Sequence, residues 1–334
     1  TQAVELVQGE QFESVVDLMR HAVSVGMPQS IGHEFFEDLE ARFQEITRIT
    51  TPTGLAELDH KDVLDGGLGR GELGVVVAPT GVGKSHWLVN MGCQALMRGK
   101  TVVHYTFELS ETLTGKRYDA NITDIPVSDL IERKEEVIQN YDNNEYGNLI
   151  IKYFPCRSAS VNTIRNHLEK LKLRNYSPSL VIIDYADVMK STKSYDALRL
   201  ELQLIYEELR QMAADFNIPV WTASQSNRNG ANADYVGLEN MGESYGKAQV
   251  SDVVLGLSRK PEEKASGFAR LFVAKNRAGM DGINLKLKID TSKSKFSVLS
   301  GDELESYDML VDPKKKMKAM WDQVKIAKKE LNNG

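Results

Sequence analysis

The chain has 334 residues, of which 41% are hydrophobic and 26% are charged, and its formal net charge is −6. This length and composition are typical of a globular protein with a sizeable core, arranged as one large α/β domain with appendages or as two smaller domains. No apolar run reaches the ~18 residues that a membrane span requires, and no signal peptide opens the chain. The negative charge excludes a global basic field, so a nucleic acid would have to bind through local basic loops.

The two ends of the chain carry opposite charge. Residues 1–50 hold nine acidic residues and three arginines, whereas residues 312–330 hold seven lysines and three acidic residues. The chain begins at Thr1 and not at Met, so we expect it to be a fragment or a processed product. Cys93 and Cys156 match no metal-ligand spacing, which favours two reduced thiols over a zinc site.

Residues 1–50 are predicted to form a helical linker that docks on another surface. Residues 11–26 have a broad apolar face, and residues 33–48 form a second amphipathic helix. The apolar stripe of this second helix consists of Phe36, Leu39, Phe43 and Ile46. These helices have too little apolar surface to make a domain alone, so they would pack on their own domain or on a neighbouring subunit.

Apolar runs alternate with amphipathic helices from about residue 71 onward. Buried strands are predicted at 73–78, 101–107, 180–184 and 220–224, with helices at 85–98 and 197–216. This alternation favours a mostly parallel sheet covered on both faces. Segments 270–275 and 283–299 alternate apolar and polar residues, as hairpin strands do. The predicted fold class is therefore α/β, with a main domain at 51–300 and a C-terminal tail at 301–334 that carries a basic amphipathic helix at 313–329.

The stretch APTGVGKS at residues 78–85 satisfies the P-loop pattern, with alanine in place of the first glycine. Gly81 and Gly83 would let the backbone curl so that its N–H groups face phosphates, and the helix N-terminus adds its dipole. Lys84 would reach the β- and γ-phosphates, and the Ser85 hydroxyl would bind Mg²⁺. We therefore predict ATP with Mg²⁺ as the ligand. The predicted ligand-binding residues are Ala78, Pro79, Thr80, Gly81, Val82, Gly83, Lys84, Ser85 and His86.

Three polar residues that follow other predicted strands would complete a hydrolytic site. Asp184 ends an apolar run and would hold the metal shell, because ligands of open α/β sheets bind at that edge. Glu108 follows the strand after the P-loop helix and is suited to polarising a water. Gln225 follows a third strand, where it would sense the γ-phosphate. The alternative for the two acids is that each simply ends its strand.

The order of these motifs resembles that of the DnaB-type hexameric replicative helicases. The resemblance rests on the P-loop, Glu108, IIDY at 182–185, PVWTASQSNR at 219–228 and VAKNRAG at 273–279. It covers about residues 51–300, and the likeness to the replicative helicases of T-even-type phages extends it upstream to about residue 14. The resemblance implies a RecA-like P-loop ATPase core that assembles into a ring.

The resemblance also assigns roles to matching positions. The implied catalytic residues are Lys84, Glu108, Gln225, Lys275 and Arg277, and the implied metal-binding residues are Ser85 and Asp184. Lys275 and Arg277 look like the pair that a subunit inserts into its neighbour's ATP site, where a cation stabilises charge on the transferring phosphoryl group. Without the resemblance, KNR in a hairpin would more often be a solvated turn.

The sequence departs from the DnaB pattern in two places: at Tyr185-Ala186-Asp187, and at 242–246, where GESYG replaces the usual run of the DNA loop. Two loops, at 190–199 and after Gln225, are candidates for sequence-independent contact with a DNA backbone. Their lysines would alternatively be solvated surface residues. The predicted DNA-binding residues are Lys190, Lys193, Arg228, Asn229, Glu243, Ser244, Tyr245, Gly246 and Lys247.

The function implied by the resemblance is an ATP-driven, ring-forming DNA helicase that moves 5′→3′ on single-stranded DNA at the replication fork. The expected partners are single-stranded DNA, five further copies of the chain in a homo-hexamer, primase and a helicase loader, but no membrane. The expected location is the cytoplasm, that of a bacterial host if a phage encodes the protein. The alternatives are a RecA-type recombinase or other DNA-binding ATPase that does not unwind, a loader or regulatory ATPase, and a small-molecule kinase.

Overall fold

The computed structural model describes residues 35–36, 48–227, 229–231, 233–241 and 245–311. The chain divides into two compact units, residues 1–47 and 48–334, and the account that follows concerns the second unit. Almost all of the predicted linker therefore lies outside the described residues, except Phe35 and Phe36, which form a turn. The predicted basic helix at 313–329 also lies outside them.

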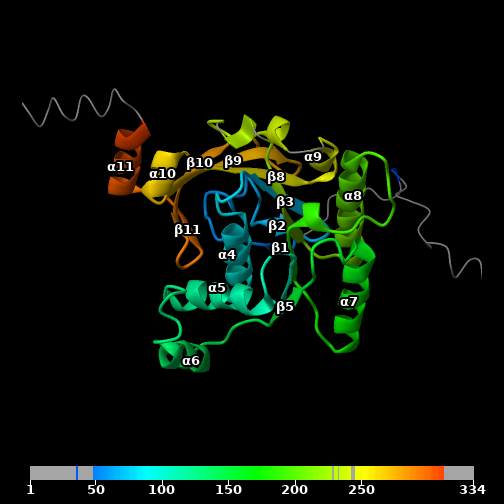
Figure 1. Ribbon diagram of the computed structural model, residues 1–334, viewed down its shortest axis with the longest axis horizontal. Helices are drawn as coiled ribbons and strands as arrows, with labels where there is room; N and C mark the ends of the chain where they lie inside the picture. The colour runs from blue at the N-terminus through cyan, green and yellow to red at the C-terminus, as the bar shows by residue number, and fades with distance from the viewer. Residues whose placement is uncertain (1–34, 37–47, 228, 232, 242–244, 312–334) are drawn as a thin grey trace, which may run out of the picture. The chain divides into compact units, whose positions relative to one another are not determined.

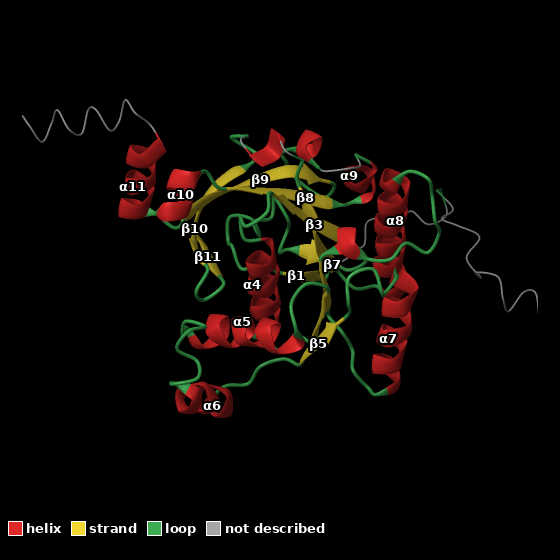
Figure 2. Cartoon of the chain, in the orientation of Figure 1, coloured by secondary structure: helices red, strands yellow, loops and turns green. Residues whose placement is uncertain are grey.

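A nine-stranded sheet organises the described residues, in the order β11-β10-β9-β8-β3-β7-β6-β4-β5 (Figures 1 and 2). The strands from β8 to β5 in this order are parallel, whereas β9, β10 and β11 are antiparallel. The strands are β3 (Leu73–Ala78), β4 (Val102–Thr106), β5 (Leu149–Tyr153), β6 (Leu180–Asp184), β7 (Val220–Gln225), β8 (Val253–Ser258), β9 (Phe268–Asn276), β10 (Asn284–Asp290) and β11 (Lys295–Val298). Two short strands, β1 (Thr50–Thr51) and β2 (Leu68–Gly69), pair separately. The prediction of a mostly parallel α/β sheet is confirmed.

Helices cover both faces of the parallel part, as Figure 1 shows for α4 and α5 on one side and α7 and α8 on the other. The longer helices are α4 (Lys84–Leu96), α5 (Glu111–Thr123), α6 (Lys134–Asn143), α7 (Val161–Leu173), α8 (Leu198–Phe216) and α11 (Gly301–Val311). Two short helices are α9 (Gly246–Val250) and α10 (Pro261–Ala265). Three 3₁₀ turns are η1 (Ala186–Val188), η2 (Asn229–Ala231) and η3 (Leu238–Asn240).

The two faces of β3 explain why the sheet is buried on both sides. Val76 packs in the cluster that contains Trp87 of α4, whereas Val75 and Val77 pack in the cluster that contains Leu209 of α8. Alternate residues of a strand point to opposite faces, so a strand made of one apolar run fills both clusters. No described helix is long and apolar enough to cross a membrane.

The described part of the tail is a helix that docks on the antiparallel end of the sheet. Tyr307 of α11 packs with Phe268 and Leu299, and its hydroxyl donates a 2.8 Å hydrogen bond to the Glu263 carboxylate. Glu263 is itself buried and pairs with Arg270 of β9 at 2.9 Å. This buried pair holds the start of the tail against the domain.

The segment between β7 and α9 crosses close to the sheet at Gly256, in the middle of β8. A Cβ atom at Gly256 would lie 1.8 Å from the carbonyl oxygen of Val236, a fully buried residue of that segment. The segment closes on itself through a bridge between Ser226 and Met241. Gly256 therefore lets the candidate DNA loop lie directly on the sheet.

We predict that Gly256→Ala lowers the free energy of unfolding by about 1–3 kcal/mol or more, since the backbone of residue 236 would have to move. The matched control is Gly115→Ala in α5, where a Cβ atom meets only Ile151 Cδ1 at 3.8 Å. This control should be neutral or should stabilise by up to ~1 kcal/mol, because alanine favours helix. Thermal unfolding of both variants compares them directly, and equal midpoints for the two would show that the close crossing does not exist.

Candidate nucleotide-binding site

The segment from β3 to α4 is the predicted phosphate-binding loop, and it lies at the carboxyl edge of the parallel sheet. Gly81 and Gly83 have φ angles of +74° and +126°, which L side chains rarely adopt. α4 begins at Lys84, directly after the loop, so its N-terminal N–H groups and dipole face the loop. A cleft of about 470 Å³ opens there.

Six of the nine predicted ligand-binding residues line this cleft: Thr80, Gly81, Gly83, Lys84, Ser85 and His86. The side chains of Ala78 and Val82 are buried in the core instead. Ala78 and Pro79 contribute through their carbonyl groups, which accept hydrogen bonds from Lys84 Nζ at 3.0 and 3.2 Å. Burial lowers the pKa of Lys84, and the carboxylates of Asp184, Glu108 and Asp187 partly oppose that shift.

Asp184 ends β6 beside the loop and is almost fully buried. Burial raises the pKa of Asp184 to about 6, with repulsion from Glu108 adding to the shift and a hydrogen bond from the Ser85 hydroxyl opposing it. Its Oδ1 atom has no hydrogen-bond partner among the described residues. A buried carboxylate oxygen without a donor, next to a hydroxyl, fits the oxygen ligands that Mg²⁺ prefers. Ser85 and Asp184 are therefore chemically suited to hold this ion.

Glu108 and Gln225 both line the cleft, Glu108 shortly after the end of β4 and Gln225 at the end of β7. Glu108 is solvent-exposed, two residues after β4 ends, in a turn that the Thr106 hydroxyl closes by hydrogen bonds with Leu109. Gln225 ends β7, and its side-chain amide donates a 2.8 Å hydrogen bond to the Thr80 hydroxyl of the loop. The structure thus brings the predicted base and sensor to one site with Lys84, Ser85 and Asp184.

The cleft also contains residues that the sequence did not reveal. These additional lining residues are Arg117, Tyr185, Arg259, Lys264 and Thr291. The cations among them make the cleft electropositive, which suits a triphosphate. Burial, followed by the nearby charges of Arg117 and Arg259, lowers the pKa of His86 to about 4, so this imidazole is neutral at physiological pH. Arg259 directly follows β8, a strand with an apolar sequence, so its position after a strand was a signal in the sequence that could have placed it at this edge.

Lys275 and Arg277 do not reach this cleft, because they lie at the opposite edge of the sheet. Arg277 Nη1 lies 3.2 Å from Asp252, whose other carboxylate oxygen accepts a 2.8 Å hydrogen bond from the N–H of Leu73, the first residue of β3. The P-loop follows the last residue of β3, which is six residues long. At about 3.3 Å per residue, the two edges are about 20 Å apart, farther than an arginine side chain extends.

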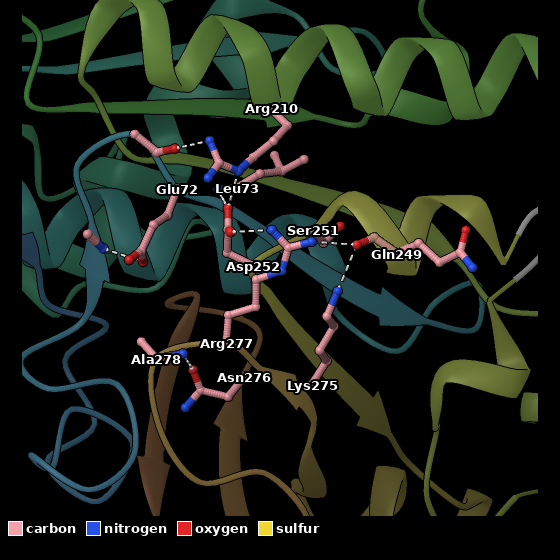
Figure 3. Close-up of polar contacts among 12 residues, drawn as sticks. Glu72, Leu73, Arg210, Gln249, Ser251, Asp252, Lys275, Asn276, Arg277 and Ala278 are labelled. Carbon is pink, nitrogen blue, oxygen red and sulfur yellow. Dashed lines mark hydrogen bonds and ion pairs between the residues drawn. The ribbon is translucent and has the colours of Figure 1, made fainter. Parts of the chain in front are cut away.

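Carbonyl groups and Asp252 hold these two cations in place (Figure 3). Lys275 Nζ donates to the carbonyl oxygens of Ala248 and Gln249 at 2.7 and 2.9 Å, and Arg277 Nη2 donates to that of Gln249 at 2.8 Å. Arg210 of α8 forms a 2.5 Å ion pair with Asp252 from the other side. The Arg277 side chain nevertheless remains half exposed, so a second molecule could contact it.

The predicted DNA-binding residues have four different outcomes. Arg228, Glu243 and Ser244 lie outside the described residues, whereas Gly246 begins α9. Lys190, Lys193, Asn229 and Tyr245 are exposed, as DNA contacts require. Lys247 is different: its side chain is 0% exposed and forms a 2.9 Å ion pair with Asp187. The expectation that Lys247 lies along a DNA path is wrong for this structure, because the ammonium group is sequestered by a carboxylate.

Comparison with known proteins matches this geometry. The family model of the DnaB-like helicase C-terminal domain matches residues 50–298. The DnaB-like replicative helicase of Enterobacteria phage T4 is 28% identical over 281 residues, which cover 80% of this chain and 58% of that protein. The replicative DNA helicase DnaB of Helicobacter pylori strain 26695 is 27% identical over 223 residues, 64% of this chain and 44% of that protein. The chain thus spans about half the length of these curated relatives.

Solved structures show the same fold. One of them, described as an ATPase domain, superposes with a TM-score of 0.66 at 20% identity, over 78% of this chain and 95% of that chain. A DnaB-like replicative helicase, described together with its interactions with primase, superposes with a TM-score of 0.68 at 20% identity, over 90% and 76% of the two chains. The fold is RecA-like, with its phosphate site at the carboxyl edge of the sheet. The chain belongs to the family of the DnaB-like helicase C-terminal domain.

Proposed function

We propose that this chain is the motor of a ring-forming replicative helicase, which hydrolyses ATP to move 5′→3′ along single-stranded DNA and separate the duplex at the fork. Membership of the DnaB-like helicase family supports the helicase activity. One observation supports ring formation most directly: the length of β3 separates Lys275 and Arg277 from the P-loop of their own subunit. Two cations that cannot reach their own site are suited to completing the site of a neighbour.

Within one subunit, the cleft residues divide the work of ATP hydrolysis. The P-loop N–H groups and Lys84 would hold the β- and γ-phosphates, and Glu108 would orient and polarise the attacking water. Mg²⁺, when held by Ser85 and Asp184, would neutralise charge on the phosphate oxygens. Gln225, already in contact with Thr80, would exchange this partner for the γ-phosphate.

Arg277 and Lys275 would act in the adjacent subunit. A guanidinium group placed on the transferring phosphoryl group stabilises charge in the transition state, so a ring of such contacts ties hydrolysis to assembly. Six copies arranged head to tail would close such a ring, because each subunit presents the cleft on one side and the cations on the other.

The DNA would pass the exposed residues of the two loops, Lys190, Lys193, Asn229 and Tyr245. The two lysines suit contact with the phosphates of a DNA backbone of any sequence, and Tyr245 could stack on a base. Arg228, Glu243 and Ser244 are proposed contacts of the same loop. Primase is a proposed partner because a solved relative is described with its interactions with primase, and a helicase loader is proposed from the family likeness. The proposed location is the bacterial cytoplasm.

We expect Lys84→Ala to reduce the rate of ATP hydrolysis at least about 100-fold, because it removes a preorganised cation from the phosphates. Steady-state phosphate release measures this loss. The matched control is Lys61→Ala, an exposed lysine outside the cleft, which should hydrolyse ATP at the wild-type rate. A Lys84→Ala variant that retains most of its activity would contradict the assignment of the cleft.

We expect Arg277→Ala to reduce ATP hydrolysis by about 10³-fold or more while nucleotide binding is largely kept, as loss of an arginine finger does. Mixing this variant with Lys84→Ala then tests whether the arginine acts in trans. In an equimolar random ring, roughly a quarter of the interfaces combine an intact cleft with an intact arginine, so activity should return. No recovery on mixing, from variants that still assemble together, would show that Arg277 serves its own subunit.

Strand separation distinguishes the helicase from a recombinase or a DNA-binding ATPase that does not unwind. We expect the chain with ATP and Mg²⁺ to unwind a forked duplex that carries a 5′ single-stranded tail for loading, and to fail on a duplex with only a 3′ tail. Gel separation of the strands measures both. Unwinding from the 3′ tail alone would reverse the proposed polarity, and ATP hydrolysis stimulated by DNA without unwinding of either substrate would favour the alternatives.

A further inference from the structure

Lys247 is a fully buried lysine that lies outside the nucleotide cleft. Its ammonium group lies 2.9 Å from Asp187 Oδ1 and 3.2 Å from the Ser224 hydroxyl, and 5.5 Å from the centre of the Tyr206 ring. Burying a charge is costly unless a partner compensates it, and removing that partner is strongly destabilising. Separating the Lys247 ammonium group from the Asp187 carboxylate would therefore strongly destabilise the folded state.

Asp187 is the centre of this cluster, and both of its carboxylate oxygens accept hydrogen bonds. Oδ1 accepts from the Tyr206 hydroxyl at 2.8 Å as well as from Lys247. Oδ2 accepts from the Ser224 hydroxyl at 3.0 Å and from the backbone N–H of Gln225 at 3.1 Å. One carboxylate thus fixes the end of β7, which carries the sensor glutamine.

The cluster connects the phosphate loop to the candidate DNA loop. The Gln225 side chain contacts Thr80 of the P-loop, its backbone contacts Asp187, and Asp187 contacts Lys247 at the start of α9. Gln225 is the last residue before the candidate DNA loop, and Lys247 lies two residues after Tyr245 at the other end of that loop. Asp187 therefore contacts both ends of the candidate DNA loop, Gln225 at one end and Lys247 at the other.

The two partners also coincide with the places where the sequence departs from the DnaB pattern. Asp187 lies in the first departure, Tyr185-Ala186-Asp187, and Lys247 directly follows the second, at 242–246. The structure brings Asp187 and Lys247, 60 residues apart in the chain, into direct contact. The carboxylate of one and the ammonium group of the other compensate each other.

We propose that the ion pair between Asp187 and the buried Lys247 is the positioning device that couples occupancy of the phosphate site to the DNA loop. This inference rests on the proposed function, because it assumes that the loop contacts DNA. When Gln225 exchanges Thr80 for a γ-phosphate, the end of β7 shifts, and the carboxylate transmits the shift to α9 through its ion pair. Neither Asp187 nor Lys247 lines the nucleotide cleft, and the Lys247 side chain is fully buried.

The test separates coupling from stability by removing the pair in two ways. Lys247→Met alone leaves Asp187 without its cation, so the thermal midpoint should fall by roughly 5–10 °C. Asp187→Asn with Lys247→Met removes both charges and should recover most of that loss. In this double variant, we expect ATP hydrolysis without DNA and nucleotide affinity to stay within about threefold of wild type, while stimulation of hydrolysis by oligo(dT) falls by about tenfold.

The matched control is the exposed ion pair at the start of α6, between Arg133, which directly precedes the helix, and Glu136, at 2.6 Å. Arg133→Met with Glu136→Gln should leave stimulation by oligo(dT) unchanged. If the double variant at Asp187 and Lys247 regains its stability together with full stimulation by DNA, the pair is structural only and the proposal is overturned.

A second measurement needs neither a variant nor DNA. Amide hydrogen exchange of Gly246–Val250 in the wild-type chain should change by about tenfold on binding a non-hydrolysable ATP analogue in the presence of Mg²⁺, because α9 is tied to the sensor. Unchanged exchange in α9, with the P-loop protected by the analogue, overturns the coupling. Absence of any stimulation by DNA in the wild type would instead contradict the proposed function, and the exchange experiment would still decide the coupling.

Discussion

The parallel direction of β3 and its neighbours is the constraint on which the rest of the site depends. Parallel strands end at one edge, so the P-loop, Asp184 and Gln225 meet there without being close in sequence. Asp252 directly precedes the parallel strand β8, and Arg277 directly follows the antiparallel strand β9, so both lie at the opposite edge of the sheet, where β3 begins. A single subunit can therefore assemble the cleft, with Arg117 and Arg259 in its lining, but cannot bring its own Arg277 to it. The strand directions of the sheet, which put the cleft and Arg277 at opposite edges, are thus the structural basis of the proposed ring.

Two carboxylates, the buried Asp252 and the partly buried Asp187, link these two edges to the rest of the domain. Asp252 ties the first residue of β3 to Arg210 and Arg277, so the strand that carries the P-loop is anchored to the cation that we propose acts in a neighbour. Asp187 ties the sensor strand to α9 in a similar way. Both use backbone N–H groups as well as charges, which fixes strand ends in position. In the proposed ring, the two clusters give each subunit one connection to the next ATP site and one to the DNA loop.

The sequence predicted the elements with strong local signals. The strands at 73–78 and 180–184 and the helix at 197–216 are apolar runs or stripes of sufficient length, and the structure has them within one residue. The prediction missed β5, a partly buried edge strand, although it opens with three consecutive apolar residues, Leu149 to Ile151. Arg117 reaches the cleft from a helix, where only the tertiary fold places it. Lys247 was misjudged because loop lysines are usually solvated, and only contact with Asp187, 60 residues earlier, explains its burial.

The central claim is that the ATP site is completed by a second subunit, and the rate of hydrolysis per chain at different protein concentrations tests it most directly. Sedimentation velocity with nucleotide, on the same samples, gives the assembly state at each concentration. We expect the rate per chain to fall by about tenfold or more as the assembly dissociates on dilution, because monomers lack Arg277 at the cleft. A rate per chain that stays constant while the chains become monomeric would show that each subunit has a complete site, and would contradict the account.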